Sequence, residues 1–250
     1  MFNRVLVAVV GSSDSGKTTA IEAIIKGLTK QGYMVASAKR IPEPEFTIDT
    51  EGKDTWRQAK AGASTVLSVA PNELAVIKKV ETKKYALEQI VAEIPDETDI
   101  IIIEGFKSLV GQDMTIPKIV ATKTDNEISE ALERYKNIIA FIGHIPEQKM
   151  ETEIPFIDTL TEPEKLVELV NNKIAVLVER KRKREEKITI QIGEQILPLG
   201  DFVQDIVRNS VLAMVSSLKG VNKEITKDLN TKIKITINTD KHGKTKKTDN

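Results

Sequence analysis

The chain has 250 residues, enough for one α/β domain with a sizeable core and a small second domain. Lysine plus arginine and aspartate plus glutamate each number 37, so no overall charge attracts the chain to nucleic acid or to a membrane surface. Cysteine is absent, which excludes disulfides, zinc–thiolate sites, cysteine-ligated iron–sulfur clusters and a cysteine nucleophile.

The N-terminal apolar run, residues 5–10, is far shorter than the roughly 20 residues that span a bilayer. No small-residue cleavage site follows it. We therefore expect a cytoplasmic protein that binds neither membrane nor nucleic acid.

The start of the chain predicts a strand, a loop and a helix in that order. Residues 4–10 are almost wholly apolar and rich in β-branched side chains, which is typical of a strand buried on both faces of a parallel sheet. A glycine-rich turn follows. Residues 18–31 then place isoleucine and leucine at helical spacing, and Gly32 stands where a helix is expected to end.

Strand and helix patterns continue to alternate along the chain. Further strands are expected at 34–38, 65–69, 74–78, 100–103, 118–121 and 138–142. Further helices are expected at 55–61, at 85–94 and from Pro163 onward. This alternation predicts an α/β fold, with a mostly parallel sheet covered by helices on both faces, and leaves the strand order open.

The charge pattern divides the chain. We expect a large N-terminal domain over residues 1–178, a charged linker over 179–187 and a small C-terminal α+β domain over 188–237. That domain has a hairpin pattern at 188–199, a helix pattern that begins at Asp201 and an alternating strand at 232–237. The tail, 238–250, is nearly devoid of apolar side chains and is expected to be disordered.

The glycine-rich turn satisfies the pattern G-x-x-x-x-G-K-[ST] between a predicted strand and a predicted helix. Its residues are Gly11, Ser12, Ser13, Asp14, Ser15, Gly16, Lys17 and Thr18. Glycines allow backbone N–H groups to surround phosphates, Lys17 reaches the β- and γ-phosphate oxygens, and Thr18 can ligate Mg²⁺. The loop therefore predicts that the α/β fold is a P-loop NTPase sheet and that it binds a nucleoside triphosphate.

Two acids at the ends of the strand at 100–103 compete for the metal side of this site. Asp99 and Glu104 are about 16 Å apart at roughly 3.3 Å per strand residue, so only one can face the ligand. In open α/β sheets the ligand lies at the carboxyl ends of the strands, which selects Glu104.

Two further acids, Asp49 and Asp54, lie in a polar stretch that can fold back over the γ-phosphate. Either can complete the Mg²⁺ shell through water. We favour Asp54, although a role as a helix cap explains this residue almost as well.

Lys123 and Asp125 follow a predicted strand. Asp125 is placed to accept hydrogen bonds from guanine, with Lys123 covering the base plane, but an ordinary polar turn has the same composition. We expect His144 and Trp56 to be loop or packing residues.

Four linked segments, GSSDSGKTT, IDTEGKDTWRQAKAGAS, IIIIEGFK and IPKI, resemble those of the molybdopterin-guanine dinucleotide biosynthesis protein B (MobB) family in order and spacing. The resemblance implies a Mg²⁺-dependent GTP-binding homodimer with weak GTP hydrolysis. It also implies that the chain assists the molybdopterin guanylyltransferase that joins GMP to molybdopterin, with molybdopterin a further candidate ligand.

By matching position, the resemblance assigns Gly16, Lys17, Thr18 and Thr19 to the phosphates, and Asp54 and Glu104 to the metal side. Lys17 and Glu104 are then the candidate catalytic residues. One departure concerns the residues after the second strand, where the family usually has Lys-His and this chain has Lys39 and Arg40. The C-terminal domain lies outside the family's core pattern.

Other functions on the same fold stay open. The main alternative is an ATP-dependent ligase or kinase that resembles dethiobiotin synthase. A partitioning or nitrogenase-type ATPase would carry an additional lysine where Ser12 stands. A scaffold with a vestigial loop is disfavoured by the intact Lys17, Thr18 and Glu104. The phosphate loops contain no evident water-positioning glutamine or arginine finger, so we expect slow hydrolysis unless a partner completes the site.

Overall fold

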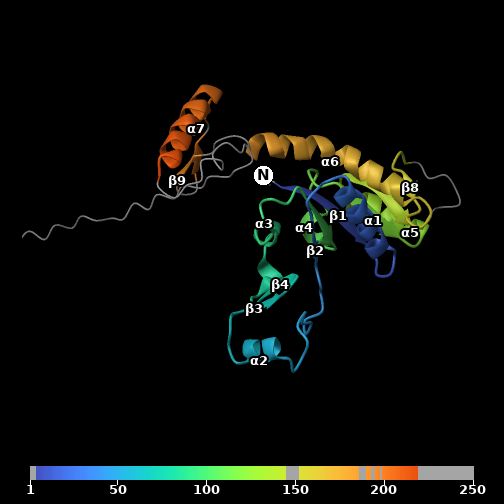
Figure 1. Cartoon of the computed structure of the whole chain (residues 1–250). Helices are drawn as coiled ribbons and strands as arrows, with labels where there is room; N and C mark the ends of the chain where they lie inside the picture. Colours follow the sequence, from blue (N-terminus) through green and yellow to red (C-terminus); the bar gives the residue numbers. More distant parts are fainter. Residues whose placement is uncertain (1–3, 145–151, 186–189, 193–194, 198, 219–250) are drawn as a thin grey trace, which may run out of the picture. The chain divides into compact units, whose positions relative to one another are not determined.

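The computed structural model describes residues 4–144, 152–185, 190–192, 195–197 and 199–218. The chain divides into two compact units, Met1–Arg184 and Glu185–Asn250. Figure 1 shows the elements of both units in chain order. The first unit contains the predicted phosphate loop.

Six strands form the main sheet of the first unit, in the order β2-β5-β1-β6-β7-β8. Every neighbouring pair is parallel. The strands are β1 (Val5–Gly11), β2 (Val35–Lys39), β5 (Ile100–Glu104), β6 (Lys118–Thr122), β7 (Ile138–Gly143) and β8 (Phe156–Ile157). β1 therefore lies between β5 and β6, an order that sequence alone left open.

Helices cover both faces of this sheet. They are α1 (Lys17–Lys30), α3 (Leu87–Val91), α4 (Lys107–Val110), α5 (Asp125–Arg134) and α6 (Pro163–Glu185). Successive β1 side chains alternate between two cores: Val5, Val7 and Val9 pack with α1 and α6, whereas Leu6, Ala8 and Val10 pack with α3, α4 and α5. The predicted α/β fold is confirmed.

The segment between β2 and α3 contains a separate two-stranded sheet and a short helix. It contains α2 (Asp54–Lys60), β3 (Thr65–Ala70), β4 (Glu73–Lys78) and a 3₁₀ turn, Thr82–Lys84. β3 and β4 pair only with each other and are antiparallel. The two residues between them are too few for a parallel crossover, so these strands cannot alternate with helices as the others do.

Helix α5 was not expected from the sequence, because its stretch is mainly polar. A local signal was nevertheless present, since Thr124 and Glu127 fit the S/T-x-x-E pattern of a helix start. The Thr124 hydroxyl accepts a hydrogen bond from the Glu127 backbone N–H at 3.3 Å. α5 buries Ile128 and Ala131 against the sheet.

The second unit contains an antiparallel pair, β9 (Ile190–Ile192) and β10 (Gln195–Leu197), followed by α7 (Asp201–Ser216). These elements lie where hydrophobic periodicity predicts a hairpin and a helix. The predicted strand at 232–237 and the tail at 238–250 lie outside the described residues. No described helix has an apolar stretch long enough to cross a membrane.

Candidate phosphate-binding site

The carboxyl ends of three parallel strands meet at one edge of the sheet. Glu104 ends β5 and pairs in register with Val9 of β1 and with Lys39 at the end of β2. The glycine-rich loop leaves β1 at Gly11, two residues beyond Val9. The topology therefore brings Glu104 and the phosphate loop together, as the sequence predicts for ligands of open α/β sheets.

Two glycines shape the loop. Gly11 has φ +142°, and a Cβ atom there would lie 2.0 Å from the carbonyl oxygen of Ala121 on β6. Gly16 has φ +86° and is the residue before α1. A side chain at either position would be strained, and at Gly11 it would also collide with a neighbouring strand. The loop also contains a hydrogen bond of 2.8 Å from the Ser15 hydroxyl to the Ser12 carbonyl oxygen.

Lys17 is the first residue of α1, and its ammonium group donates to the Ser12 carbonyl oxygen. Burial lowers the pKa of Lys17, while the nearby Glu104 carboxylate acts in the opposite direction. The lysine is thus folded onto its own loop through a neutral acceptor. A phosphate oxygen, which is charged, would be the stronger acceptor for this ammonium group.

A cavity of about 1250 Å³ opens over the loop. Nine predicted site residues line it: Gly11, Ser13, Asp14, Ser15, Gly16, Lys17, Thr18, Thr19 and Glu104. Ser12 instead lines a second cavity of about 110 Å³, on the side of β6 and α5. The cavity wall also contains four basic residues that sequence reasoning did not select: Lys39, Arg40, Lys107 and Arg134.

The oxygen atoms of Thr18 and Glu104 fit the preference of Mg²⁺ for hard ligands. Both residues line the large cavity, and the Glu104 side chain is only 15% exposed. Lys39 holds that carboxylate through an ion pair of 3.3 Å. The described residues contain no cluster of three or more histidine, cysteine or acidic side chains. Mg²⁺ needs no such cluster where one or two protein oxygens act together with phosphates and water.

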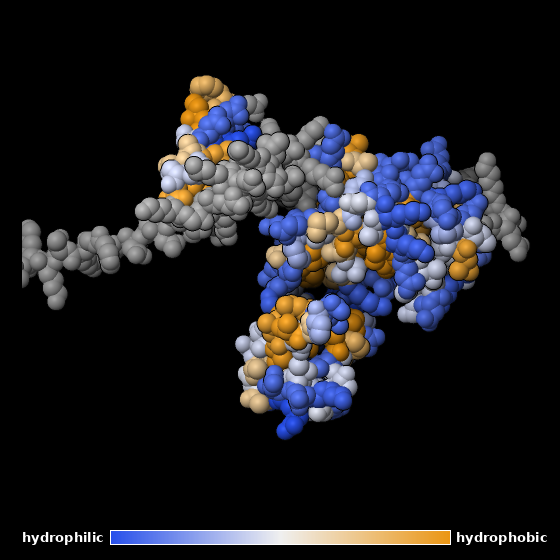
Figure 2. Space-filling view, in the orientation of Figure 1, coloured by the Kyte–Doolittle hydropathy of each residue, from blue (hydrophilic) through white to orange (hydrophobic). Residues whose placement is uncertain are grey.

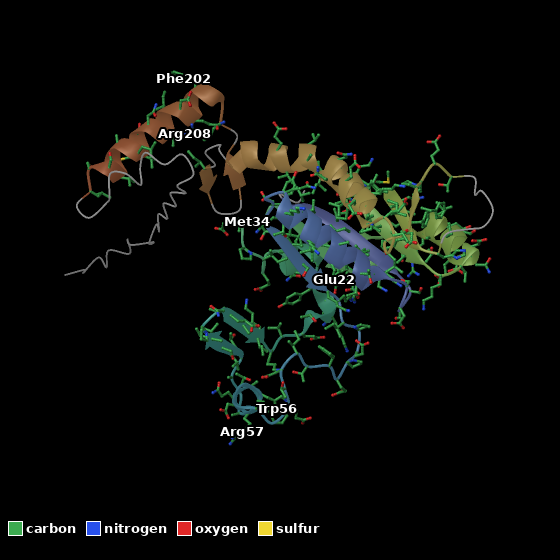
Figure 3. The ribbon with its side chains drawn as sticks, turned by 45° about the vertical axis from the view of Figure 1, so that its right-hand side comes forward. Glu22, Met34, Trp56, Arg57, Phe202 and Arg208 are labelled. Carbon is green, nitrogen blue, oxygen red and sulfur yellow. The ribbon has the colours of Figure 1, made fainter. Side chains whose placement is uncertain are left out.

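Asp54 does not line either cavity. It lies in the first turn of α2, and its side chain is 93% exposed. Figure 3 labels Trp56 and Arg57 of the same helix. The cation nearest to Asp54 is Arg57, at 3.9 Å. Asp49, the other acid weighed for this role, accepts a hydrogen bond from the Thr55 hydroxyl at 2.8 Å. In this conformation neither acid is brought to the phosphate loop.

Lys123 and Asp125 lie in the turn between β6 and α5, and neither lines the large cavity. Asp125 is the first residue of α5, and one of its oxygens lies 2.7 Å from Nε2 of His144. The His144 backbone N–H donates to the carbonyl oxygen of Thr122 at 2.8 Å. The turn is therefore held to the end of β7, and the second Asp125 oxygen has no hydrogen-bond partner among the described residues.

A profile of the protein family described as "Molybdopterin guanine dinucleotide synthesis protein B", MobB, matches residues 6–144, more than half of the chain. The chain belongs to the MobB family. The match includes the phosphate loop, Glu104 and the turn that contains Asp125, so the site described above is contained in the family region.

Relatives and solved structures agree with this assignment. An adapter protein of molybdopterin-guanine dinucleotide biosynthesis from Methanocaldococcus jannaschii is 27% identical over 238 residues, covering 88% of this chain and 94% of the relative. A Bacillus subtilis relative of the same description is 35% identical over 150 residues, covering 58% of this chain and 80% of the relative. The crystal structure of Bacillus subtilis MobB has a TM-score of 0.55 at 27% identity, covering 68% of this chain and 97% of that one.

The C-terminal unit lies beyond the MobB profile but is partly aligned with one relative. The first unit ends at residue 184 of 250, so the Methanocaldococcus alignment, which covers 88% of the chain, extends into the second unit. The region aligned with this relative therefore includes part of the second unit.

Lys39 and Arg40 replace the Lys-His pair expected from the family pattern. Lys39 binds Glu104, and the Arg40 guanidinium donates to the Ser108 hydroxyl at 3.0 Å. Both residues line the large cavity. Arginine at the second position therefore adds a permanent positive charge where a histidine would titrate near neutral pH.

Glu127 connects the phosphate loop to the turn before α5, a role that sequence reasoning missed. One of its carboxylate oxygens accepts hydrogen bonds from the Ser12 hydroxyl at 3.3 Å and from the Lys123 backbone N–H at 2.6 Å. A single side chain thus joins the predicted phosphate-binding and base-reading segments of the MobB site.

We predict that Glu127→Ala lowers the free energy of unfolding by about 0.5–1.5 kcal/mol, because two donors lose a charged acceptor that water replaces only in part. Chemical denaturation measures this change. Glu130→Ala is the matched control, because Glu130 also lines the small cavity from α5 but makes no described hydrogen bond or ion pair. Equal stability of the two variants would contradict the bridging role of Glu127.

Proposed function

We propose that the chain is a GTP-binding accessory protein in the maturation of the molybdenum or tungsten cofactor. In this role it assists formation of molybdopterin guanine dinucleotide. The intact phosphate loop of a MobB family member, with Glu104 at its edge, is the observation that carries the proposal. The Haemophilus influenzae relative, 34% identical over 117 residues, is named a molybdopterin-guanine dinucleotide biosynthesis adapter protein.

Within this proposal the loop backbone and Lys17 bind the β- and γ-phosphates. The Thr18 hydroxyl and the Glu104 carboxylate hold Mg²⁺, directly or through water. Bound Mg²⁺ would neutralise charge on the terminal phosphates. Asp54 completes the metal side only if the α2 segment moves toward the cavity, so we rank it below Glu104.

The proposal assigns guanine recognition to Lys123 and Asp125. The free oxygen of Asp125 provides one acceptor, and the oxygen that contacts His144 provides the second if the base displaces the imidazole. Glu127 accepts hydrogen bonds from both the Lys123 backbone and the Ser12 hydroxyl of the phosphate loop. These two bonds fix the distance between the turn and the loop. That coupling suits a ligand that contacts both segments.

We propose that hydrolysis of GTP is weak in the isolated chain. No glutamine lines the large cavity in the part of the chain that the structure describes, so no side-chain amide is present there to orient a water molecule. Turnover would then depend on the partner enzyme, a molybdopterin guanylyltransferase, with molybdopterin a further ligand of the complex.

We also propose a homodimer that forms through the β3–β4 hairpin. Leu67 pairs with Val76 and Val69 with Leu74, so the four side chains share one face, and each is at least half exposed. Figure 2 shows hydrophobic residues gathered on this hairpin. Lys78 pairs with Thr65 at the end of the same face, and its ammonium group forms an ion pair with Glu93. A two-stranded sheet is marginally stable alone, and its exposed aliphatic face is best covered by the same face of a second copy.

We expect Leu67→Glu to convert the dimer to a monomer, because two carboxylates would face each other across the two-fold axis. Sedimentation velocity measures the mass. Val176→Glu on α6 is the matched control, since Val176 is, like Leu67, an exposed aliphatic residue, 52% accessible, but lies on another element. A wild-type chain that is monomeric at micromolar concentration would rule out the hairpin dimer.

For the base, we expect the wild-type chain to bind GTP more tightly than ATP with Mg²⁺, and Asp125→Asn to abolish the preference. Competition titration against a fluorescent nucleotide measures both affinities. His144→Gln tests whether the imidazole only holds the turn, in which case the preference persists. A preference for ATP would instead support the ligase or kinase alternative.

A further inference from the structure

Gly11, Lys107 and Arg134 line both the large cavity and the small one. Lys107 begins α4, two residues after the glycine that follows β5, and Arg134 ends α5. The two cations therefore come from separate helices and stand where the two cavities meet. They flank the phosphate loop on the side of Gly11.

Neither cation has an anionic partner. The described residues offer no hydrogen bond or ion pair to the Lys107 ammonium group, and the Arg134 guanidinium only lies over the Tyr135 ring, 5.7 Å from its centroid. By contrast, Lys39 is paired with Glu104 and Arg40 with Ser108. Two uncompensated cations in one cavity wall favour an anionic ligand there.

A buried hydroxyl points to the same place. Thr122 at the end of β6 is 2% exposed, lines the small cavity, and its Oγ1 has no hydrogen-bond partner. Buried hydroxyl groups are nearly always hydrogen-bonded, so this one is suited to donate to a ligand oxygen. Glu127 and Glu130 line the same small cavity and would keep an anion at its mouth, beside Lys107 and Arg134.

The large cavity has room for more than a nucleotide. Its volume of about 1250 Å³ exceeds the roughly 300–1000 Å³ of ordinary ligand pockets. The wall beyond the loop includes Ile41, Pro42 and Phe46, and the Phe46 side chain is 54% exposed. An exposed aromatic ring in a cavity wall suits a flat organic group.

We propose that a second subsite, for a phosphate monoester of a planar ring compound, lies where the large and the small cavity meet. Lys107 and Arg134 bind its phosphate, Thr122 donates a hydrogen bond to it, and Phe46 contacts the ring. The inference rests on the proposed function in one respect, because it takes the phosphate loop to be occupied by the nucleotide. The competing explanation is that both cations bind the γ-phosphate of that nucleotide.

The test is calorimetric titration of phenyl phosphate into the full chain saturated with Mg²⁺ and a non-hydrolysable GTP analogue. We expect binding at one site per chain. Lys107→Gln and Arg134→Gln should each weaken it by about tenfold, as for the loss of a charge-assisted hydrogen bond. Phe46→Ala should weaken binding of phenyl phosphate but not of inorganic phosphate. Lys136→Gln, an exposed lysine that lines neither cavity, is the control and should change nothing.

The outcomes separate this inference from the proposed function. If phenyl phosphate does not bind while the nucleotide does, or if the two charge variants weaken only the nucleotide, the second subsite is wrong. If no nucleotide binds, the proposed function fails, and titration of phenyl phosphate into Lys17→Ala, whose phosphate loop is disabled, tests the subsite alone. Binding that survives Lys17→Ala but not Lys107→Gln supports it.

Discussion

The burial of β1 on both faces is the constraint on which the site depends. Its valine, leucine and alanine side chains alternate between two cores and are almost wholly inaccessible to solvent. Burying a valine or leucine side chain contributes about 1.5–3 kcal/mol, so a shift of this strand is costly. Gly11 at its end is pressed against Ala121 of β6, and Val9 is in register with Glu104 of β5. The phosphate loop and its acidic neighbour therefore have fixed positions before any ligand binds.

The charged side chains at this edge of the sheet determine which ligands the large cavity can bind. The large cavity is lined by five basic residues, Lys17, Lys39, Arg40, Lys107 and Arg134, and by three acidic ones, Asp14, Glu43 and Glu104. Burial already lowers the pKa of Lys17, which shows that its charge is poorly solvated there. A bound anion would neutralise the positive charge that the three acidic residues of the cavity neutralise only in part. A chain with no net charge thus concentrates positive charge at one place.

Much of this arrangement was predictable from the sequence. The core strands stand out because two-sided burial demands continuous apolar runs, and the loop because close backbone approach demands glycine. The position of Glu104 at the site was predictable because this residue stands at the carboxyl end of its strand, where open α/β sheets bind ligands. The strand order was not predictable, because every buried strand has the same apolar character. Helix α5 was missed because few of its residues are buried, and with it the bridging role of Glu127. The cations Lys107 and Arg134 are far apart in sequence and only the fold brings both to one cavity.

The most direct test of this account is the affinity of the chain for Mg²⁺·GTP with and without the loop lysine, measured by calorimetric titration. We expect Lys17→Ala to weaken binding by at least about tenfold, because a charge-assisted hydrogen bond to phosphate is lost. Lys30→Ala, at the other end of the same helix, should bind like the wild type. Equal affinity of Lys17→Ala and the wild type would contradict the assignment of this loop as the triphosphate site.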